Sequence, residues 1–162
     1  VSGEDARVLQ SVATLARAAG AIVTSDIDRV TDRTDELVAA VSIPILAEHV
    51  PAALTGESQI GRALRMLHER HGTLMCVTLG RSGAMIVDRG RVHYAPAFAV
   101  EAVDTTGAGD VFRGAFIYGL LRGDDPPALL RFANAAAAVS CTRRGAMNGV
   151  PSLADVKRML TN

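Results

Sequence analysis

The sequence holds few of the residue types that several protein classes require. Among its 162 residues are two cysteines, one lysine, two tyrosines, four phenylalanines and no tryptophan. Cys76 and Cys141 cannot build a disulfide framework, and neither has a second ligand at metal-binding spacing, so we expect a reducing compartment and no structural zinc. No run approaches the roughly 18 apolar residues of a membrane-spanning helix. We therefore expect a cytoplasmic protein with no membrane partner.

Charge and aromatic content also argue against a nucleic-acid partner. Seventeen basic residues balance seventeen acidic ones, which leaves no overall positive field to attract a phosphate polymer. Few aromatic side chains are present on which bases could stack. The length fits a single domain with one core, and no linker divides it. Because Val1 is not a methionine and no leader follows it, we expect the chain to be a fragment.

Apolar periodicity predicts alternating strands and helices along the chain. Strands are expected at 21–24, 41–47, 74–79, 84–87 and 92–95, and helices at 4–19, 57–70, 108–122, 127–143 and 152–160. Ser2 would cap the first helix, and Gly20 would end it. The residues from Asp88 to Arg91 are typical of a hairpin turn. This order predicts a mostly parallel α/β sheet with helices on both faces and one local antiparallel hairpin.

The segment most informative about chemistry is the glycine turn that opens the helix at 108. Gly107, Ala108 and Gly109 have little or no side chain, so their backbone N–H groups and the positive end of the helix can surround a phosphoryl group. Asp110 follows directly. A carboxylate beside a phosphate is unfavourable unless it moves a proton or holds a metal, which favours a general base that activates a hydroxyl. The alternative is that Asp110 caps the helix and the glycines only permit a tight turn.

Two familiar phosphate-binding loops are excluded. The only lysine is Lys157, so the chain contains no Gly-Lys-Ser/Thr sequence and no Walker A motif. Phe112 stands where the dinucleotide-binding fingerprint requires its third glycine. The turn is therefore neither a P-loop nor part of a Rossmann dehydrogenase.

The residues around this turn resemble a known family. The sequence DTTGAGDVFRGAF at 104–116 resembles the signature of the ribokinase-like (PfkB) carbohydrate kinases, and the stretches at 54–57, 77–87 and 132–146 resemble further segments of that family in the same order. The resemblance implies a ribokinase-like three-layer α/β/α sandwich. It also implies that residues 1–162 are the nucleotide-binding and catalytic part of a kinase domain, without its N-terminal sugar-binding and lid part.

The same resemblance implies an ATP-dependent transferase that moves the γ-phosphoryl group of MgATP to a hydroxyl of a sugar or sugar derivative. Asp110 would be the general base, and the turn Gly107-Ala108-Gly109 would be the anion hole. The residues implied to line the nucleotide are Thr78, Gly80, Arg81, Gly83 and Asn134.

Some members of the family also bind a monovalent cation such as K⁺. The matching residues here are Asp104, Thr106, Ser140, Arg143, Gly145 and Gly149. Without the resemblance, Arg143 is equally well explained as a cation that complements the C-terminus of its own helix. The cation site therefore has a structural alternative.

The sequence also departs from the family pattern. Where the family shows Asn-x-x-Glu for the magnesium and phosphate water network, this chain has Ala47-Glu48-His49-Val50, and Glu48 would act on Mg²⁺ through water. A second hypothesis is therefore a catalytically impaired nucleotide- or metabolite-binding module of the same fold, and the isolated chain could be incomplete and inactive. Arg113 stands where a small polar residue is common; it could reach a phosphate or face solvent, and we expect it to face solvent. The sequence does not decide whether the acceptor is a sugar, a sugar acid or a nucleoside, nor whether the protein forms a homodimer.

Overall fold

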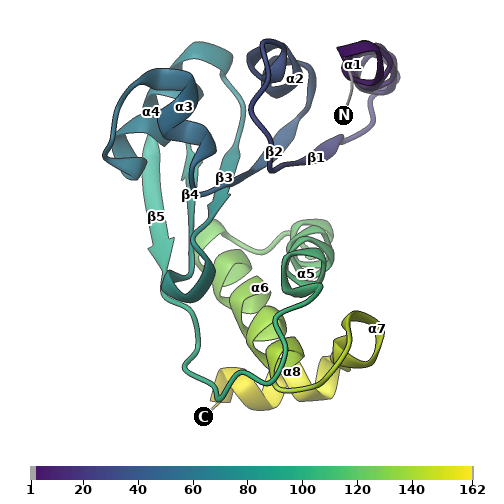
Figure 1. Cartoon of the computed structure of the whole chain (residues 1–162), viewed down its shortest axis with the longest axis vertical. Coiled ribbons are helices and arrows are strands. Elements are labelled where there is room, and N and C mark those ends of the chain that lie inside the picture. Colours follow the sequence, from purple (N-terminus) through teal and green to yellow (C-terminus); the bar gives the residue numbers. More distant parts are fainter. Residues whose placement is uncertain (1–2, 162) are drawn as a thin grey trace. The chain divides into compact units, whose positions relative to one another are not determined.

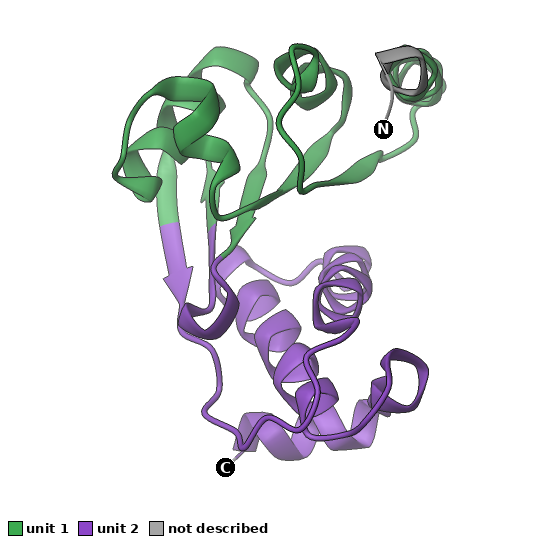
Figure 2. Cartoon of the chain, in the orientation of Figure 1, with its two compact units in different colours: residues 1–78, 86–92 green, residues 79–85, 93–162 purple. Residues whose placement is uncertain are grey.

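The computed structural model describes residues 3–161 of the chain (Figure 1). The chain divides into two compact units (Figure 2): unit 1 comprises residues 1–78 and 86–92, and unit 2 comprises residues 79–85 and 93–162. Each unit contains a hydrophobic cluster of its own, around Val41 in unit 1 and around Phe132 in unit 2. Ser2, the predicted cap of the first helix, lies outside the described residues.

The described strands form one sheet in the order β1-β2-β3-β4-β5. Their bounds are Thr24–Ile27 for β1, Ile43–Ala47 for β2, Met75–Thr78 for β3, Ala84–Asp88 for β4 and Arg91–Ala95 for β5. The strands β1, β2 and β3 run parallel, with Asp26 opposite Ile45 and Ile45 opposite Cys76. β2 and β3 are buried along almost their whole length, which is typical of parallel strands. The predicted parallel arrangement is confirmed, but the first strand was predicted at 21–24 and lies at Thr24–Ile27, so its predicted bounds were wrong.

The strands β4 and β5 form the local hairpin. Arg89 and Gly90, the two residues between them, have positive φ angles of 49° and 75°, as a two-residue type I′ turn requires. The Gly90 N–H donates a hydrogen bond of 3.0 Å to Nε2 of His68, which lies in unit 1 with the turn. The predicted hairpin is therefore confirmed.

Unit 1 carries the helices α1 (Gly3–Ala18), α2 (Thr34–Ala40), α3 (Val50–Thr55) and α4 (Ile60–His71). α4 corresponds to the helix predicted at 57–70, and it buries Ala63, Leu64 and Leu67 at helical spacing. The sequence did not predict α2 and α3. With seven and six residues they are too short to show a helical period.

Unit 2 carries the helices α5 (Ala108–Arg122), α6 (Pro126–Cys141), α7 (Ala146–Gly149) and α8 (Leu153–Thr161), together with the short 3₁₀ helix η1 (Gly80–Ser82). α6 begins where its N-cap Asp125 accepts a hydrogen bond of 2.9 Å from the Ala128 N–H. α5 and α8 both pack against α6, and the buried Phe132 and Val156 belong to that contact (Figure 1). The three longer helices were predicted to within two residues.

No helix in the part of the chain between residues 3 and 161 combines the length and the apolar character needed to cross a lipid bilayer.

Candidate active site

The glycine turn lies immediately before α5. Gly107 is the N-cap with a φ of +79°, and a Cβ atom at this position would lie 2.8 Å from the Cβ of Ala146. Both the left-handed backbone and this close contact exclude a side chain. The Ala108 N–H donates to the Thr105 carbonyl at 3.1 Å, whereas the N–H groups of Gly109 and Asp110 have no acceptor among the residues that the structure describes. These unengaged donors point out of the helix N-terminus, where an anion is favoured.

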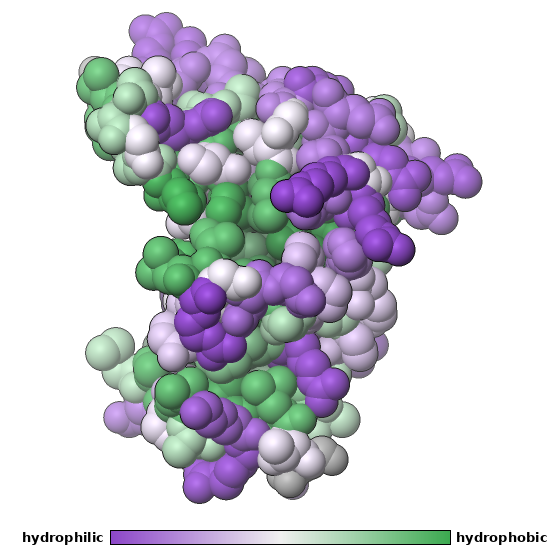
Figure 3. Space-filling view, turned by 180° about the vertical axis from the view of Figure 1, so that it is seen from behind, coloured by the Kyte–Doolittle hydropathy of each residue, from purple (hydrophilic) through white to green (hydrophobic). Residues whose placement is uncertain are grey.

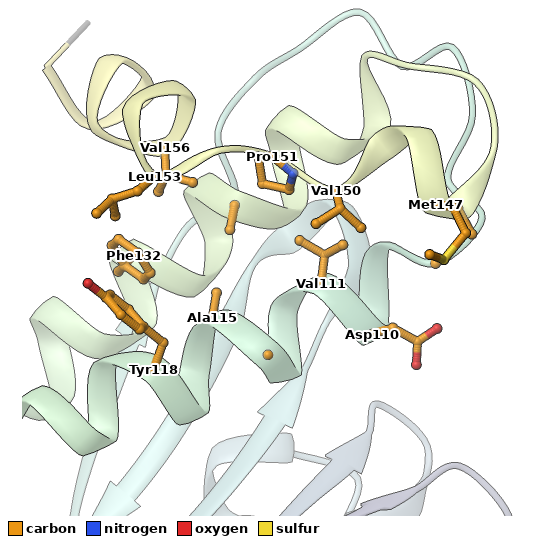
Figure 4. A pocket seen from close by; sticks show the side chains of 14 residues that line it. Asp110, Val111, Ala115, Tyr118, Phe132, Met147, Val150, Pro151, Leu153 and Val156 are labelled. Atoms are coloured by element: carbon orange, nitrogen blue, oxygen red, sulfur yellow. The ribbon is translucent and has the colours of Figure 1, made fainter.

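Asp110 stands in the first turn of α5, with 77% of its side chain exposed. Figure 4 shows its carboxylate at one end of a pocket, pointing away from the helix. The side chain of Asp110 therefore does not cap the helix. At its N-cap, Gly107, α5 has no hydrogen bond from any capping side chain. The carboxylate is accessible to a second molecule.

The Asp110 carboxylate forms an ion pair with Arg113, one turn further along α5. Arg113 Nη2 donates to Asp110 Oδ1, and Nη1 of the same guanidinium lies 3.5 Å from the position that a Cβ on Gly109 would take. The side chain of Arg113 is 25% exposed. The expectation that Arg113 faces solvent is wrong, because the guanidinium is held over the turn by the carboxylate.

The pocket beside Asp110 has a volume of about 540 Å³ and belongs to unit 2. Asp110 is its one charged lining residue, and the remainder of the lining is small or apolar (Figure 4). The residues that line it are Gly107, Asp110, Val111, Gly114, Ala115, Tyr118, Phe132, Ala136, Ala146, Met147, Val150, Pro151, Leu153 and Val156. The sequence did not predict this pocket. Apolar residues on both faces of α5 were a signal for it, because one of those faces has no core to pack against.

Asp104 ties the turn before α5 to the start of α7. Its Oδ1 accepts from the Thr106 N–H at 2.9 Å, and its Oδ2 accepts from the Gly145 N–H at 2.8 Å. Hydrogen bonds from the side chain and backbone of Thr106 and from the backbone of Gly145 lower the pKa of Asp104 to about 2. Three of the residues predicted for the monovalent cation therefore lie together, held by the carboxylate itself.

The other residues predicted for the cation have structural contacts in unit 2. The Ser140 hydroxyl donates to the Ala137 carbonyl at 2.7 Å, and Arg143 pairs with Asp155 at 3.1 Å. A Cβ on Gly149 would lie 3.0 Å from the Ser140 carbonyl oxygen, a tight contact that a larger residue could keep only if the neighbouring backbone shifted. The ion pair links Arg143 to α8, a contact that the sequence did not predict; the predicted alternative was a charge that complements the C-terminus of its own helix.

Two residues predicted for the nucleotide meet at the end of β5. Asn134 is 5% exposed, and its Nδ2 donates to the carbonyl oxygens of Ala95 and Pro96 at 3.0 and 3.1 Å. Gly83 has a φ of +102°, and a Cβ there would lie 2.1 Å from the Ala95 carbonyl oxygen. Both residues thus hold one backbone segment. Of the others in unit 2, Gly80 opens η1 and Arg81 is exposed.

Thr78 and Glu48 belong to unit 1, at the carboxyl ends of neighbouring parallel strands. Thr78 ends β3 opposite Ala47, and its hydroxyl donates to the Leu46 carbonyl at 3.4 Å. Glu48 is exposed in the turn directly after β2. Both residues therefore lie near one edge of the sheet. Within residues 3–161, no group of three or more histidine, cysteine, aspartate or glutamate side chains forms a metal cage.

Comparison with known proteins decides the family. The model of the pfkB family carbohydrate kinases matches residues 2–153. The chain belongs to the pfkB family of carbohydrate kinases. It is 33% identical over 124 residues to a ribokinase of Haemophilus influenzae and 35% identical over 136 residues to a fructokinase of Klebsiella pneumoniae, which covers 74% and 80% of this chain. The resemblance seen in the sequence is confirmed.

Solved ribokinase structures share the fold. The ribokinase of Thermotoga maritima has a TM-score of 0.72 at 32% identity over 85% of this chain, and that of Arabidopsis thaliana, complexed with ribose and ATP, has 0.83 at 27% over 100%. An Escherichia coli structure provisionally named ribokinase II, in complex with ATP and Mg²⁺, has 0.87 at 26% over 99%. The predicted ribokinase-like α/β fold is confirmed.

This pfkB chain is shorter than its relatives. It spans 40% of the Haemophilus ribokinase and 44% of the Klebsiella fructokinase. It spans 48%, 60% and 55% of the three solved chains. The chain therefore corresponds to about half of these kinases.

Proposed function

We propose that the chain takes part in transferring the γ-phosphoryl group of ATP to a hydroxyl of a sugar or sugar derivative. The observation that carries the proposal is the exposed Asp110 carboxylate, directly after a glycine turn with unengaged N–H groups and at one end of a pocket. The turn suits a phosphoryl group, and the carboxylate suits a hydroxyl proton. Family relatives named ribokinase and fructokinase support a sugar as the acceptor.

In the proposed reaction the acceptor oxygen forms a bond to the γ-phosphorus of ATP. The bond from phosphorus to the β,γ-bridging oxygen breaks, and its electron pair leaves with ADP. The hydroxyl proton passes to Asp110, while the N–H groups of Gly109 and Asp110 donate to the phosphoryl oxygens. A positioned base contributes roughly 10²- to 10⁴-fold to the rate, and each preorganised donor about 10²- to 10³-fold.

The nucleotide-binding role of Thr78, Gly80, Arg81, Gly83 and Asn134 is part of this proposal. Gly83 and Asn134 both fix the backbone at Ala95 and Pro96. The amide nitrogen of Asn134 is buried and donates to two backbone carbonyl groups. We therefore infer that Asn134 fixes the position of this backbone segment, which would line one side of the nucleotide site. That role differs from direct contact with adenine.

The donor set of the chain fits a magnesium ion that arrives with ATP. Mg²⁺ binds mainly to phosphate oxygens and water with one or two carboxylates, so the lack of a metal cage among the described residues is the expected pattern. Bound Mg²⁺ would neutralise charge on the phosphates. Glu48, exposed in the turn after β2, is the carboxylate that we propose for a contact through water.

The monovalent cation, K⁺, stays a prediction. Asp104, Thr106 and Gly145 are already linked by hydrogen bonds, and Arg143 is paired with Asp155. A cation at this loop would therefore take backbone carbonyl groups as ligands.

One observation favours the second hypothesis, a catalytically impaired nucleotide- or metabolite-binding module. Val50 stands at the last position of the family's Asn-x-x-Glu segment and is 0% exposed. A buried valine cannot order water at a magnesium ion, so this part of the machinery is altered. The altered position lowers the expected rate and leaves the Asp110 turn intact.

The Asp110→Asn variant tests the proposed reaction. We expect phosphoryl transfer from radiolabelled ATP to ribose or fructose to fall by at least about 100-fold, because asparagine cannot take the hydroxyl proton. Calorimetry should show that the variant still binds ATP. Asp125→Asn, the same change at the N-cap of α6, is the matched control because asparagine caps a helix equally well.

Three outcomes separate the hypotheses. An Asp110→Asn variant that keeps more than a tenth of the transfer rate contradicts the base role. A wild-type chain that binds ATP and transfers nothing to any sugar supports the impaired module. A wild-type chain that binds no nucleotide contradicts both the kinase and the nucleotide-binding module.

A further inference from the structure

Arg113 lies between the two parts of the proposed active site. Its Nη2 contacts Asp110 Oδ1, and its Nη1 lies 3.5 Å from the Cβ position of Gly109. One guanidinium thus touches the carboxylate and lies beside Gly109, the last glycine of the turn, at the same time. A phosphoryl group that moves from the turn to an acceptor hydroxyl at Asp110 would pass this guanidinium.

The position of this cation is unfavourable for the helix alone. Arg113 turns its charge toward the N-terminal end of α5, where the helix dipole is positive, and cations are disfavoured there. Exposed ion pairs of this kind contribute little to stability. With 77% of the Asp110 side chain exposed, this ion pair by itself adds little to the stability of α5. A phosphate bound at the turn would offset the charge of Arg113 at this end of the helix.

The proposed reaction also needs positive charge at this place. A carboxylate next to the γ-phosphoryl repels it, and kinases of other folds use lysine or arginine to offset such charge. The only lysine of the chain, Lys157, lies in α8. Among the ion pairs of unit 2, Arg113 is the arginine that contacts Asp110.

We propose that Arg113 is a catalytic residue that binds the γ-phosphoryl group. The inference rests on the proposed function. In the free protein the guanidinium neutralises Asp110 and holds its carboxylate beside the turn. When ATP binds, the guanidinium exchanges the carboxylate for phosphoryl oxygens, and this leaves the carboxylate free to accept the proton of the acceptor hydroxyl. Arg113 makes or breaks no covalent bond and transfers no proton.

This role predicts selective binding of ATP over ADP, since only ATP carries the γ-phosphoryl group. Binding of MgATP and MgADP is measured by calorimetry for the wild-type chain, Arg113→Gln and Arg113→Lys. In Arg113→Gln we expect ATP affinity to fall by about 10- to 100-fold, the size of a charge-assisted hydrogen bond. We expect ADP affinity to stay within about twofold. Arg113→Lys keeps the positive charge but loses the paired N–H groups of the guanidinium, so its ATP affinity should lie between those of the wild type and Arg113→Gln.

Arg158→Gln is the matched control. Arg158 forms the same kind of ion pair with an aspartate three residues away, on α8, and its loss should change neither affinity. Circular dichroism of each variant reports whether it is folded, and Arg113→Lys serves if Arg113→Gln is not. An unchanged ratio of ATP to ADP affinity in the folded Arg113 variants overturns the role of Arg113 and leaves the proposed function standing. A wild-type chain that binds neither nucleotide overturns both.

Discussion

Gly83 is a residue whose identity is set by backbone geometry. Its φ is +102°, and a Cβ at this position would meet backbone atoms, the Ala95 carbonyl oxygen at 2.1 Å and the Ala97 nitrogen at 2.7 Å. Backbone atoms cannot move aside as the tip of a side chain can. A glycine is therefore required here whether or not a nucleotide binds.

We expect Gly83→Ala to lower the free energy of unfolding by at least about 1–3 kcal/mol, the range for one residue in a disfavoured backbone region. Urea denaturation measures the change. The comparison variant is Gly114→Ala in α5, where nothing lies within 4 Å of the added Cβ. Alanine there should stabilise by about 0.5–1 kcal/mol. If the two variants had the same stability, the backbone explanation of Gly83 would fail.

Asp110 and Arg113 show how far the sequence predicts the position of a single side chain. The glycines before Asp110 predicted its chemistry, and the structure places it in an exposed position at a pocket. The direction of the Arg113 side chain was predicted wrongly. Spacing of three residues in a helix was a signal for the pair, since such residues are neighbours on one face.

At the scale of elements, α5 depends on the turn that precedes it. Asp104 joins this turn to the start of α7 through the Thr106 and Gly145 N–H groups, and the Cys141 carbonyl accepts from the N–H groups of Val103 and Asp104 at 2.8 and 3.2 Å. Two loops far apart in the sequence thus fix where the first turn of α5 begins. Asp110 takes its position from that arrangement.

The lowered pKa of Asp104 predicts how this contact responds to acid. Its pKa in the folded chain is about 2 against an ordinary 3.8, so the ionised carboxylate stabilises the fold above pH 3.8. That stabilisation declines as the pH falls from 3.8 toward 2. Thermal unfolding followed between pH 6 and pH 2 should show this loss in the wild type. Asp104→Asn should be less stable at pH 6, and its difference from the wild type should shrink toward pH 2.

Asp88→Asn is the control for this experiment, since Asp88 ends β4 in unit 1 and Asp104 lies in unit 2. If the wild type and Asp104→Asn differed by the same amount at pH 6 and at pH 2, the carboxylate would not be what holds the two loops.

At the scale of the whole molecule, unit 2 exposes apolar side chains. Met147 is 86% exposed, Leu121 76% and Val150 54%. Figure 3 shows hydrophobic surface on this lower part of the molecule. Exposed apolar patches in soluble proteins commonly mark contacts with other proteins. Met147 and Val150, which line the pocket with Asp110, are among these exposed side chains.

We expect the purified chain to self-associate with rising concentration, because contact between copies removes this surface from water. Sedimentation velocity measures the association. The double substitution Leu121→Lys and Met147→Lys should reduce it, whereas Ile22→Lys, at a position that is 62% exposed in unit 1, should not. Dissociation by Leu15→Lys in α1 and not by the unit 2 pair would place the contact on α1 and contradict this prediction.

The sequence by itself determined the family, the parallel strands with their hairpin, the longer helices and the turn at Asp110. These features depend on residues close together along the chain: apolar periods, glycines with little side chain, and a motif of neighbouring residues. The short helices α2 and α3 were not predicted, because six or seven residues are too few to show a helical period.

Tertiary structure decided the remainder. Asn134 meets Ala95 across 39 positions of sequence, Asp104 meets Gly145 across 41, and the pocket gathers residues of α5, α6, α7 and α8. A pattern read along the chain carries no distance between such residues. Packing of the helices sets those distances, and with them which side of α5 is covered and which side is left open beside Asp110.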